Sequence, residues 1–110
     1  MSHLPYLFIA DLESESEIPH RGIHSQTVSV DAGVEVVLFA MAAGERLHDH
    51  TSARPAVVHV IAGTGELLVA GDTYAIARGS WLRMPARTPH GIAAGTPLVF
   101  ALYLLPTTDT

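Results

Sequence analysis

Glycine and proline recur at intervals of roughly eight to twelve residues through most of this chain, and the runs between them are rich in Val, Ile, Leu and Thr. Short apolar runs separated by turn residues at this spacing predict an all-β sandwich or barrel. The pair Gly71-Asp72 lies between two such runs and is typical of a hairpin turn. The expected strands cover residues 26–30, 34–42, 56–62, 65–70, 72–76, 80–84, 91–94 and 98–105.

The chain has 110 residues, which is enough for one domain with one hydrophobic core. Hydrophobic residues make up 48% and charged residues 15%, a composition that excludes a disordered chain. We expect an N-terminal arm or edge strand at residues 1–25 and a β-barrel at residues 26–110. Within the arm, the acidic segment 11–17 is open to two interpretations, a short helix or a loop.

The formal net charge is −5, and the basic side chains number only six, all of them arginines. A nucleic-acid partner is therefore not expected, because such partners are bound through dense basic surfaces. The N-terminus lacks the basic and apolar regions of a signal peptide, and no apolar run is long enough to cross a membrane. We expect a cytoplasmic protein with no membrane partner.

Three histidines carry the strongest chemical signal. His48 and His50 lie two residues apart in a segment that reads as a strand, so both side chains are expected on one face. His90 follows a proline-rich turn and can add a third ring nitrogen from another strand. Because the chain has no cysteine, a metal here would be held by nitrogen or oxygen, which suits Fe, Mn, Ni, Cu or Zn. The pattern predicts one divalent transition metal with open coordination positions.

The same residues resemble the two sequence motifs of the cupin superfamily, over roughly residues 44–105. The first motif corresponds to Gly44, then His48 and His50, then Gly63. The second corresponds to Gly79-Ser-Trp-Leu-Arg-Met-Pro85, followed by His90. The resemblance implies a single-domain jelly-roll β-barrel, the double-stranded β-helix. It is weaker for function, because one fold can carry many chemistries.

The chain departs from the cupin pattern at two informative positions. Ala56 occupies the place of the family's glutamate ligand and cannot bind a metal. Arg87 stands where the family has glycine, two residues after the proline. The remaining ligands resemble three-histidine cupin sites, which occur in oxygen-using enzymes. The resemblance therefore implies a metal set of His48, His50 and His90.

His59 is the possible fourth ligand. It lies in an apolar strand, three residues after Ala56, so regular alternation places it on the opposite face. A β-bulge would reverse that alternation and bring it to the metal. The strands that would line the barrel supply the expected pocket residues, which are Ala56, Met84, Phe100 and Arg83.

Three functions remain open from the sequence. The first is a metal-dependent, dioxygenase-like enzyme acting on a small metabolite. The second is a non-catalytic cupin that binds or senses a metal or small molecule. The third is a metal-free isomerase or epimerase in which the histidines act as acid–base groups. Several strands are apolar on both faces, so we also expect a homodimer.

Overall fold

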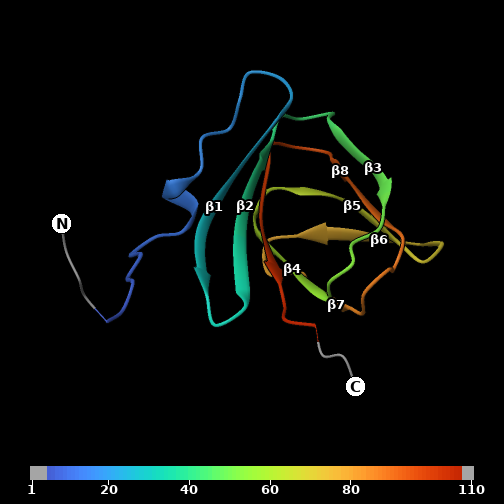
Figure 1. The fold of residues 1–110 in the computed structure, drawn as a ribbon. Helices are drawn as coiled ribbons and strands as arrows, with labels where there is room; N and C mark the ends of the chain where they lie inside the picture. Colours follow the sequence, from blue (N-terminus) through green and yellow to red (C-terminus); the bar gives the residue numbers. More distant parts are fainter. Residues whose placement is uncertain (1–4, 108–110) are drawn as a thin grey trace.

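The computed structural model describes residues 5–107 and contains two antiparallel β-sheets that enclose a common core (Figure 1). The first sheet has five strands in the order β1-β2-β9-β4-β7. These strands are β1 (Ile23–Asp31), β2 (Val34–Met41), β9 (Leu98–Leu104), β4 (Ala56–Ala62) and β7 (Trp81–Met84).

The second sheet has four strands in the order β3-β8-β5-β6. They are β3 (Arg46–His50), β8 (His90–Ala94), β5 (Thr64–Val69) and β6 (Asp72–Ala77). Strands distant in sequence are neighbours in both sheets, as β9 lies between β2 and β4 and β8 lies between β3 and β5. This is the all-β, single-domain jelly roll that the sequence predicts.

Each of the eight expected strands is present, and most strand ends lie within a few residues of the predicted ones. The strand at Ala56–Ala62 has the predicted bounds, whereas β1 begins at Ile23 and so includes the last residues of the predicted arm. One further strand, β3, carries His48 and His50, which the sequence also places on a strand. The acidic segment 11–17 contains a single 3₁₀ turn, η1 (Glu13–Glu15), which has features of both the helix and the loop interpretations.

The main core lies between the two sheets. Along β4 the side chains of Ala56, Val58 and Val60 all face this core and are almost completely buried. Leu67 and Ile92 reach it from the second sheet. Burial of an aliphatic side chain of this size contributes about 1.5–3 kcal/mol, so this cluster stabilises the packing of the two sheets.

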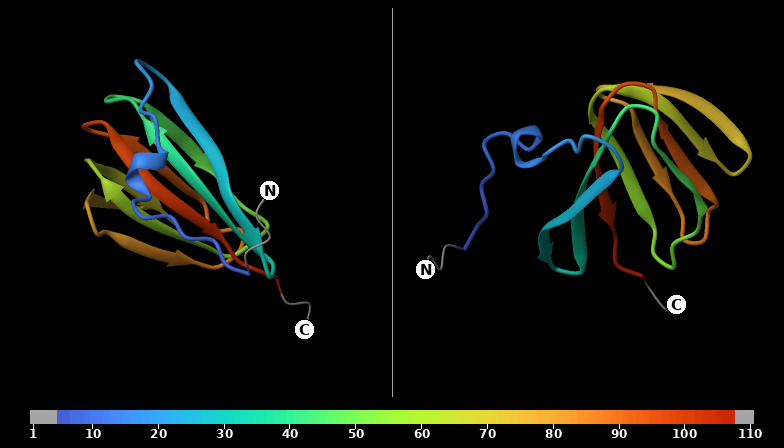
Figure 2. Two further views of the ribbon diagram at one scale, coloured as in Figure 1. Left: turned by 90° about the vertical axis from the view of Figure 1, so that its left-hand side faces the viewer. Right: turned by 90° about the horizontal axis from the view of Figure 1, so that it is seen from above.

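A second apolar cluster covers the outer face of the first sheet. Leu38 and Ala40 of β2 and Val99 and Ala101 of β9 are buried there, and Leu12 of the N-terminal segment packs against them. The two-sided apolar pattern of these strands is thus satisfied in part within the chain itself. Beyond this contact, the N-terminal segment leads away from the barrel on the side of β1 (Figure 2).

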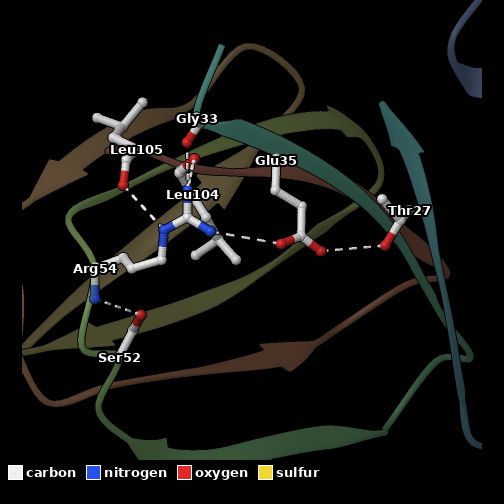
Figure 3. A network of polar contacts seen from close by, with 7 residues as sticks. All are labelled: Thr27, Gly33, Glu35, Ser52, Arg54, Leu104 and Leu105. Atoms are coloured by element: carbon white, nitrogen blue, oxygen red, sulfur yellow. Dashed lines mark hydrogen bonds and ion pairs between the residues drawn. The ribbon is translucent and has the colours of Figure 1, made fainter. Parts of the chain in front are cut away.

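Arg54 fastens the loop before β4 to two other parts of the chain (Figure 3). Its guanidinium donates to the carbonyl oxygens of Leu105 at 3.0 Å and Leu104 at 3.1 Å, and also to that of Gly33. It also lies 3.6 Å from Glu35 Oε1. One planar fork of donors therefore connects the C-terminal end of β9 with the β1–β2 turn.

Within residues 5–107, no helix has the length and apolar character needed to span a membrane.

Candidate functional site

A β-bulge in β3 sets the position of the candidate site. Leu47 pairs with Ile92 and His50 pairs with His90, so three steps along β3 correspond to two steps along β8. The extra residue in β3 reverses the normal alternation of side chains beyond it. Leu47 and His50 therefore share the face of the sheet that also carries Ile92 and His90.

Gly91 makes room for this bulge. A Cβ atom at this position would lie 2.7 Å from Asp49 Oδ1 and 2.9 Å from the carbonyl oxygen of Leu47. Any larger residue would push the bulged segment of β3 away from β8. Glycine within a strand commonly marks such a close approach of backbones.

His50 and His90 lie opposite each other on the two strands. Their ring centroids are 4.3 Å apart and their planes meet at 55°. His90 is buried, with 8% of its surface exposed, whereas His50 is exposed. Rings this close can direct one nitrogen each at a single shared atom, such as a metal ion bound at about 2.1 Å.

The two rings have the same hydrogen-bond arrangement. His50 Nδ1 lies 3.0 Å from the carbonyl oxygen of His48, and His90 Nδ1 lies 2.8 Å from the carbonyl oxygen of Thr88. A carbonyl can only accept, so each Nδ1 carries the proton in its neutral ring. Each Nε2 is then the lone-pair nitrogen, free to bind a metal or to accept a hydrogen bond.

A small apolar cavity of about 30 Å³ adjoins the pair. It is large enough for one ion, one water molecule or one small functional group. Phe39 and Phe100 stack beside it, with ring centroids 4.8 Å apart and planes within 3°. The other walls come from residues of both sheets: Leu47, Val58, Leu67, Gly91, Ile92 and Leu102.

His48 does not line this cavity. Its side chain is exposed on β3, and its carbonyl oxygen, not its ring, is what contacts His50. The expectation that His48 and His50 share a face assumed regular alternation, which the bulge between Leu47 and His50 interrupts. The structure thus brings together two of the three histidines expected at a metal.

His59 lies on the outer face of the first sheet. Its neighbours Val58 and Val60 face the core, so normal alternation turns His59 outward. There it lines a different groove, together with Asp11, Glu13 and Tyr103. The bulge that could have brought it to the site does occur in β4, but after Val60, too late to change the direction of His59.

The expected pocket residues divide into three groups. Phe100 lines the cavity beside the histidines. Ala56 and Met84 are buried in the main core but are not part of the cavity wall. Arg83 is exposed on β7, because it alternates with the inward-facing Met84.

Sequence reasoning missed most of the apolar wall. Ile92 lies two residues after His90, and Val58 lies two residues after Ala56. Residues two apart in a strand share a face, so alternation alone predicts that Ile92 and Val58 face the interior. Leu47 gives no such signal, since it reaches the cavity only through the bulge. Gly91, next to His90, is the sequence feature that could have indicated this bulge.

The donor set of the described residues fits part of a metal site. His50 and His90 supply two neutral nitrogens with the correct tautomer, an arrangement typical of metal-bound histidines. No group of three or more His, Asp or Glu side chains within residues 5–107 is placed to hold one ion. Catalytic zinc sites usually have three protein ligands, so the pair accounts for two of them.

The barrel is similar to several solved structures. A conserved protein of unknown function from Streptococcus pyogenes is 23% identical, with a TM-score of 0.82 over 98% of this chain and 95% of that one. A cupin superfamily protein from Desulfitobacterium hafniense is 19% identical, with a TM-score of 0.83 over 96% of this chain and 97% of the other. At these identities the similarity establishes the fold.

Salicylate 1,2-dioxygenase from Pseudoaminobacter salicylatoxidans also matches, at 15% identity and a TM-score of 0.72, over 84% of this chain and 27% of that protein. No curated protein matched this chain when its sequence was compared. A family model described as the cupin domain matches residues 37–104, which include both strands of the histidine pair. The chain therefore belongs to the cupin family.

Proposed function

We propose that this cupin binds a small oxygen- or sulfur-bearing metabolite at the His50–His90 pair, through one divalent transition metal. The observation that carries the proposal is the shared tautomer of the two rings. Both Nδ1 atoms are occupied by carbonyl oxygens two residues earlier, which leaves both Nε2 atoms for one ligand. Histidines that bind metals are usually oriented by such a bond at the other ring nitrogen.

His48 is the proposed third ligand on the basis of the sequence pattern alone. It lies close to His50 in the chain and is exposed as His50 is, but unlike His50 it does not line the cavity. We therefore assign His50 and His90 the larger share of the binding free energy. A ranking of the three histidines by their effect on metal affinity tests this assignment.

The residues around the pair would orient a ligand and limit access of water. Phe39, Phe100 and Leu102 form an apolar wall, so a polar group that enters here exchanges water for the two histidines. A bound metal would supply Lewis acidity and positions for an anionic ligand, since neutral imidazoles leave its charge uncompensated. Because one solved neighbour is a dioxygenase, a dioxygenase-like reaction is the first activity to assay.

A second candidate function is ligand binding without a metal. It is favoured by the lack of a third correctly placed donor in the described part of the chain. In that case the two Nε2 atoms would accept hydrogen bonds directly from hydroxyl groups or protonated groups of the ligand. Such a protein would be a binding or sensing module, or an isomerase that uses the rings as acid and base.

Elemental analysis of protein purified without chelators or a metal-binding tag distinguishes the two candidates. The metal proposal predicts about one equivalent of Fe, Mn, Ni, Cu or Zn per chain, as for a single mononuclear site. The result that would overturn it is an apoprotein that also takes up none of these ions on titration. That result would leave the metal-free function as the better account.

Single substitutions assign the ligands. His50→Ala and His90→Ala should abolish stoichiometric metal binding, while His48→Ala should weaken it by about tenfold. His59→Ala is the matched control, because it removes a histidine from the outer face of the same barrel. Equal loss of metal in the His59 variant would show that the change reflects a general effect on the fold.

A further inference from the structure

A second, much larger hollow lies where the two sheets end. Strands β6 and β7 are the terminal strands of the second and first sheets, and no strand within residues 5–107 joins them. Between them is an open apolar groove of about 370 Å³, within the range of small-molecule sites. It is more than ten times the volume of the cavity beside His50 and His90, about 30 Å³.

Two aromatic side chains border the groove. Tyr74 of β6 is 52% exposed and Trp81 of β7 is 61% exposed. Exposure of such large aromatic side chains to water costs free energy, which is recovered when another surface covers them. Among the described residues, none with a charged side chain lines the groove, so it favours an uncharged, apolar or aromatic group.

The groove adjoins the histidine cavity, and the two hollows share part of their walls. Val58 of β4 and Leu67 of β5 line both hollows. The large groove and the small cavity beside the histidines therefore meet at these two side chains. A ligand that is confined to the 30 Å³ cavity would be limited to a single small group, so the body of a larger ligand needs space elsewhere.

We propose that the β6–β7 groove binds the apolar body of the same ligand whose polar head reaches His50 and His90. The ligand class is a small amphipathic molecule with an aromatic or branched apolar body and one anionic or oxygen-bearing head. This inference rests on the proposed function for the site of the head group. Tyr74 and Trp81 enclose the body, while Leu67 and Val58 contact the link between body and head.

Trp81 is the only tryptophan in the chain, so its fluorescence reports directly on the groove. We would load the protein with Zn²⁺ and titrate it with phenylbutyrate, which has an aromatic body and a carboxylate head that would bind the metal. The expected result is a saturable change in Trp81 emission, with butyrate binding at least about tenfold more weakly because it lacks the ring. No change in Trp81 emission with millimolar phenylbutyrate would contradict the inference.

Substitutions in β6 test the location. Tyr74 lines the groove and pairs with the inward-facing Leu67, so Tyr74→Ala should weaken phenylbutyrate binding by about tenfold without disturbing the core. Thr73→Ala is the matched control, since Thr73 is exposed on the same strand but does not line the groove. Equal affinity in the Tyr74 variant and its control would place the ligand body elsewhere.

The head group is tested separately. His90→Ala should weaken binding of phenylbutyrate but leave butylbenzene, which has no polar head group, nearly unchanged. If both probes bind the His90 variant as they bind the wild type, the groove and the histidine site are independent and the joint site is refuted. The metal content of the wild type is measured without these probes, so failure of the groove inference and failure of the proposed function remain distinguishable.

Discussion

His50 and His90 are direct partners in the β3–β8 ladder, with their ring centroids 4.3 Å apart, although they are forty residues apart in the sequence. The pairing depends on a one-residue bulge in β3, without which His50 would face away from the cavity. The geometry of the site is thus a property of the strand register more than of the histidine spacing.

Gly91→Ala should disturb this register. The added methyl group would meet Asp49 Oδ1 and the Leu47 carbonyl oxygen, and the carbonyl oxygen cannot move without shifting β3. We expect a loss of about 1–3 kcal/mol in the free energy of unfolding, measured by urea denaturation. Metal or ligand affinity should fall as well, because the His50 backbone moves with the bulge.

Gly95→Ala is the control for that substitution. A methyl group there would be 3.5 Å from its nearest neighbour, the Thr64 carbonyl oxygen, which is an ordinary contact. Its effect should be small on both stability and affinity. If Gly91→Ala changes stability and affinity as little as Gly95→Ala does, the small size of Gly91 is not what allows the bulge in β3.

Arg87→Gly should stabilise the protein. Arg87 has a φ of 64°, a left-handed conformation that costs a non-glycine residue about 1–2 kcal/mol. Its backbone N–H, which donates to Ser52 O at 2.7 Å, is retained in glycine. Glycine also has greater freedom in the unfolded chain, which offsets part of this gain. The free energy of unfolding, measured by urea denaturation, should therefore rise by about 0.5 kcal/mol.

Arg78→Gly provides the comparison for Arg87, because Arg78 is equally exposed and has no positive φ. Glycine there should lower the free energy of unfolding through chain entropy alone. A decrease of similar size at both positions would contradict the strain assigned to Arg87.

Arg54→Ala should lower the free energy of unfolding by about 2 kcal/mol, since three backbone carbonyl oxygens lose a charged donor. Arg54→Lys should recover little of this loss, because one ammonium group cannot reproduce the planar fork. Thermal or urea denaturation measures both effects. Arg83→Ala, at an exposed position, should change stability by less than about 0.5 kcal/mol, and a similar effect from both alanine variants would contradict the role of Arg54.

The homodimer remains a prediction. Leu7 and Phe8 are 64% and 78% exposed on the N-terminal segment, which is a large apolar surface for a chain of this size. Leu7→Ser combined with Phe8→Ser should convert a dimer to a monomer in light scattering, whereas Val30→Ser, also at an exposed apolar position, should not. A wild-type monomer at micromolar concentration would contradict the prediction.

The strand pattern was predictable because it depends on local features. Turn residues and alternating apolar side chains mark the ends and faces of strands such as Ala56–Ala62, whose bounds agree. The outward direction of His59 followed from the same alternation. Arg87 could be singled out as well, since the family has glycine at a position where the structure has a positive φ.

The site was less predictable because it depends on pairing between distant strands. Nothing in His48-Asp49-His50 alone indicates a bulge, which arises only when β3 is aligned with β8. The same is true of Leu47, which becomes a wall residue through that bulge, and of the β6–β7 groove, which exists because two strands end their sheets. Arg83 was expected in the pocket, yet its position next to the buried Met84 turns it outward.

The most direct measurement is the tautomer of the histidine rings by ¹⁵N NMR, with and without added Zn²⁺. We expect His50 and His90 to be protonated at Nδ1 in the apoprotein and both Nε2 resonances to shift together when zinc binds, while His59 does not respond. Protonation of either ring at Nε2, or a zinc response without His50 and His90, would contradict the assignment of this pair as the functional site.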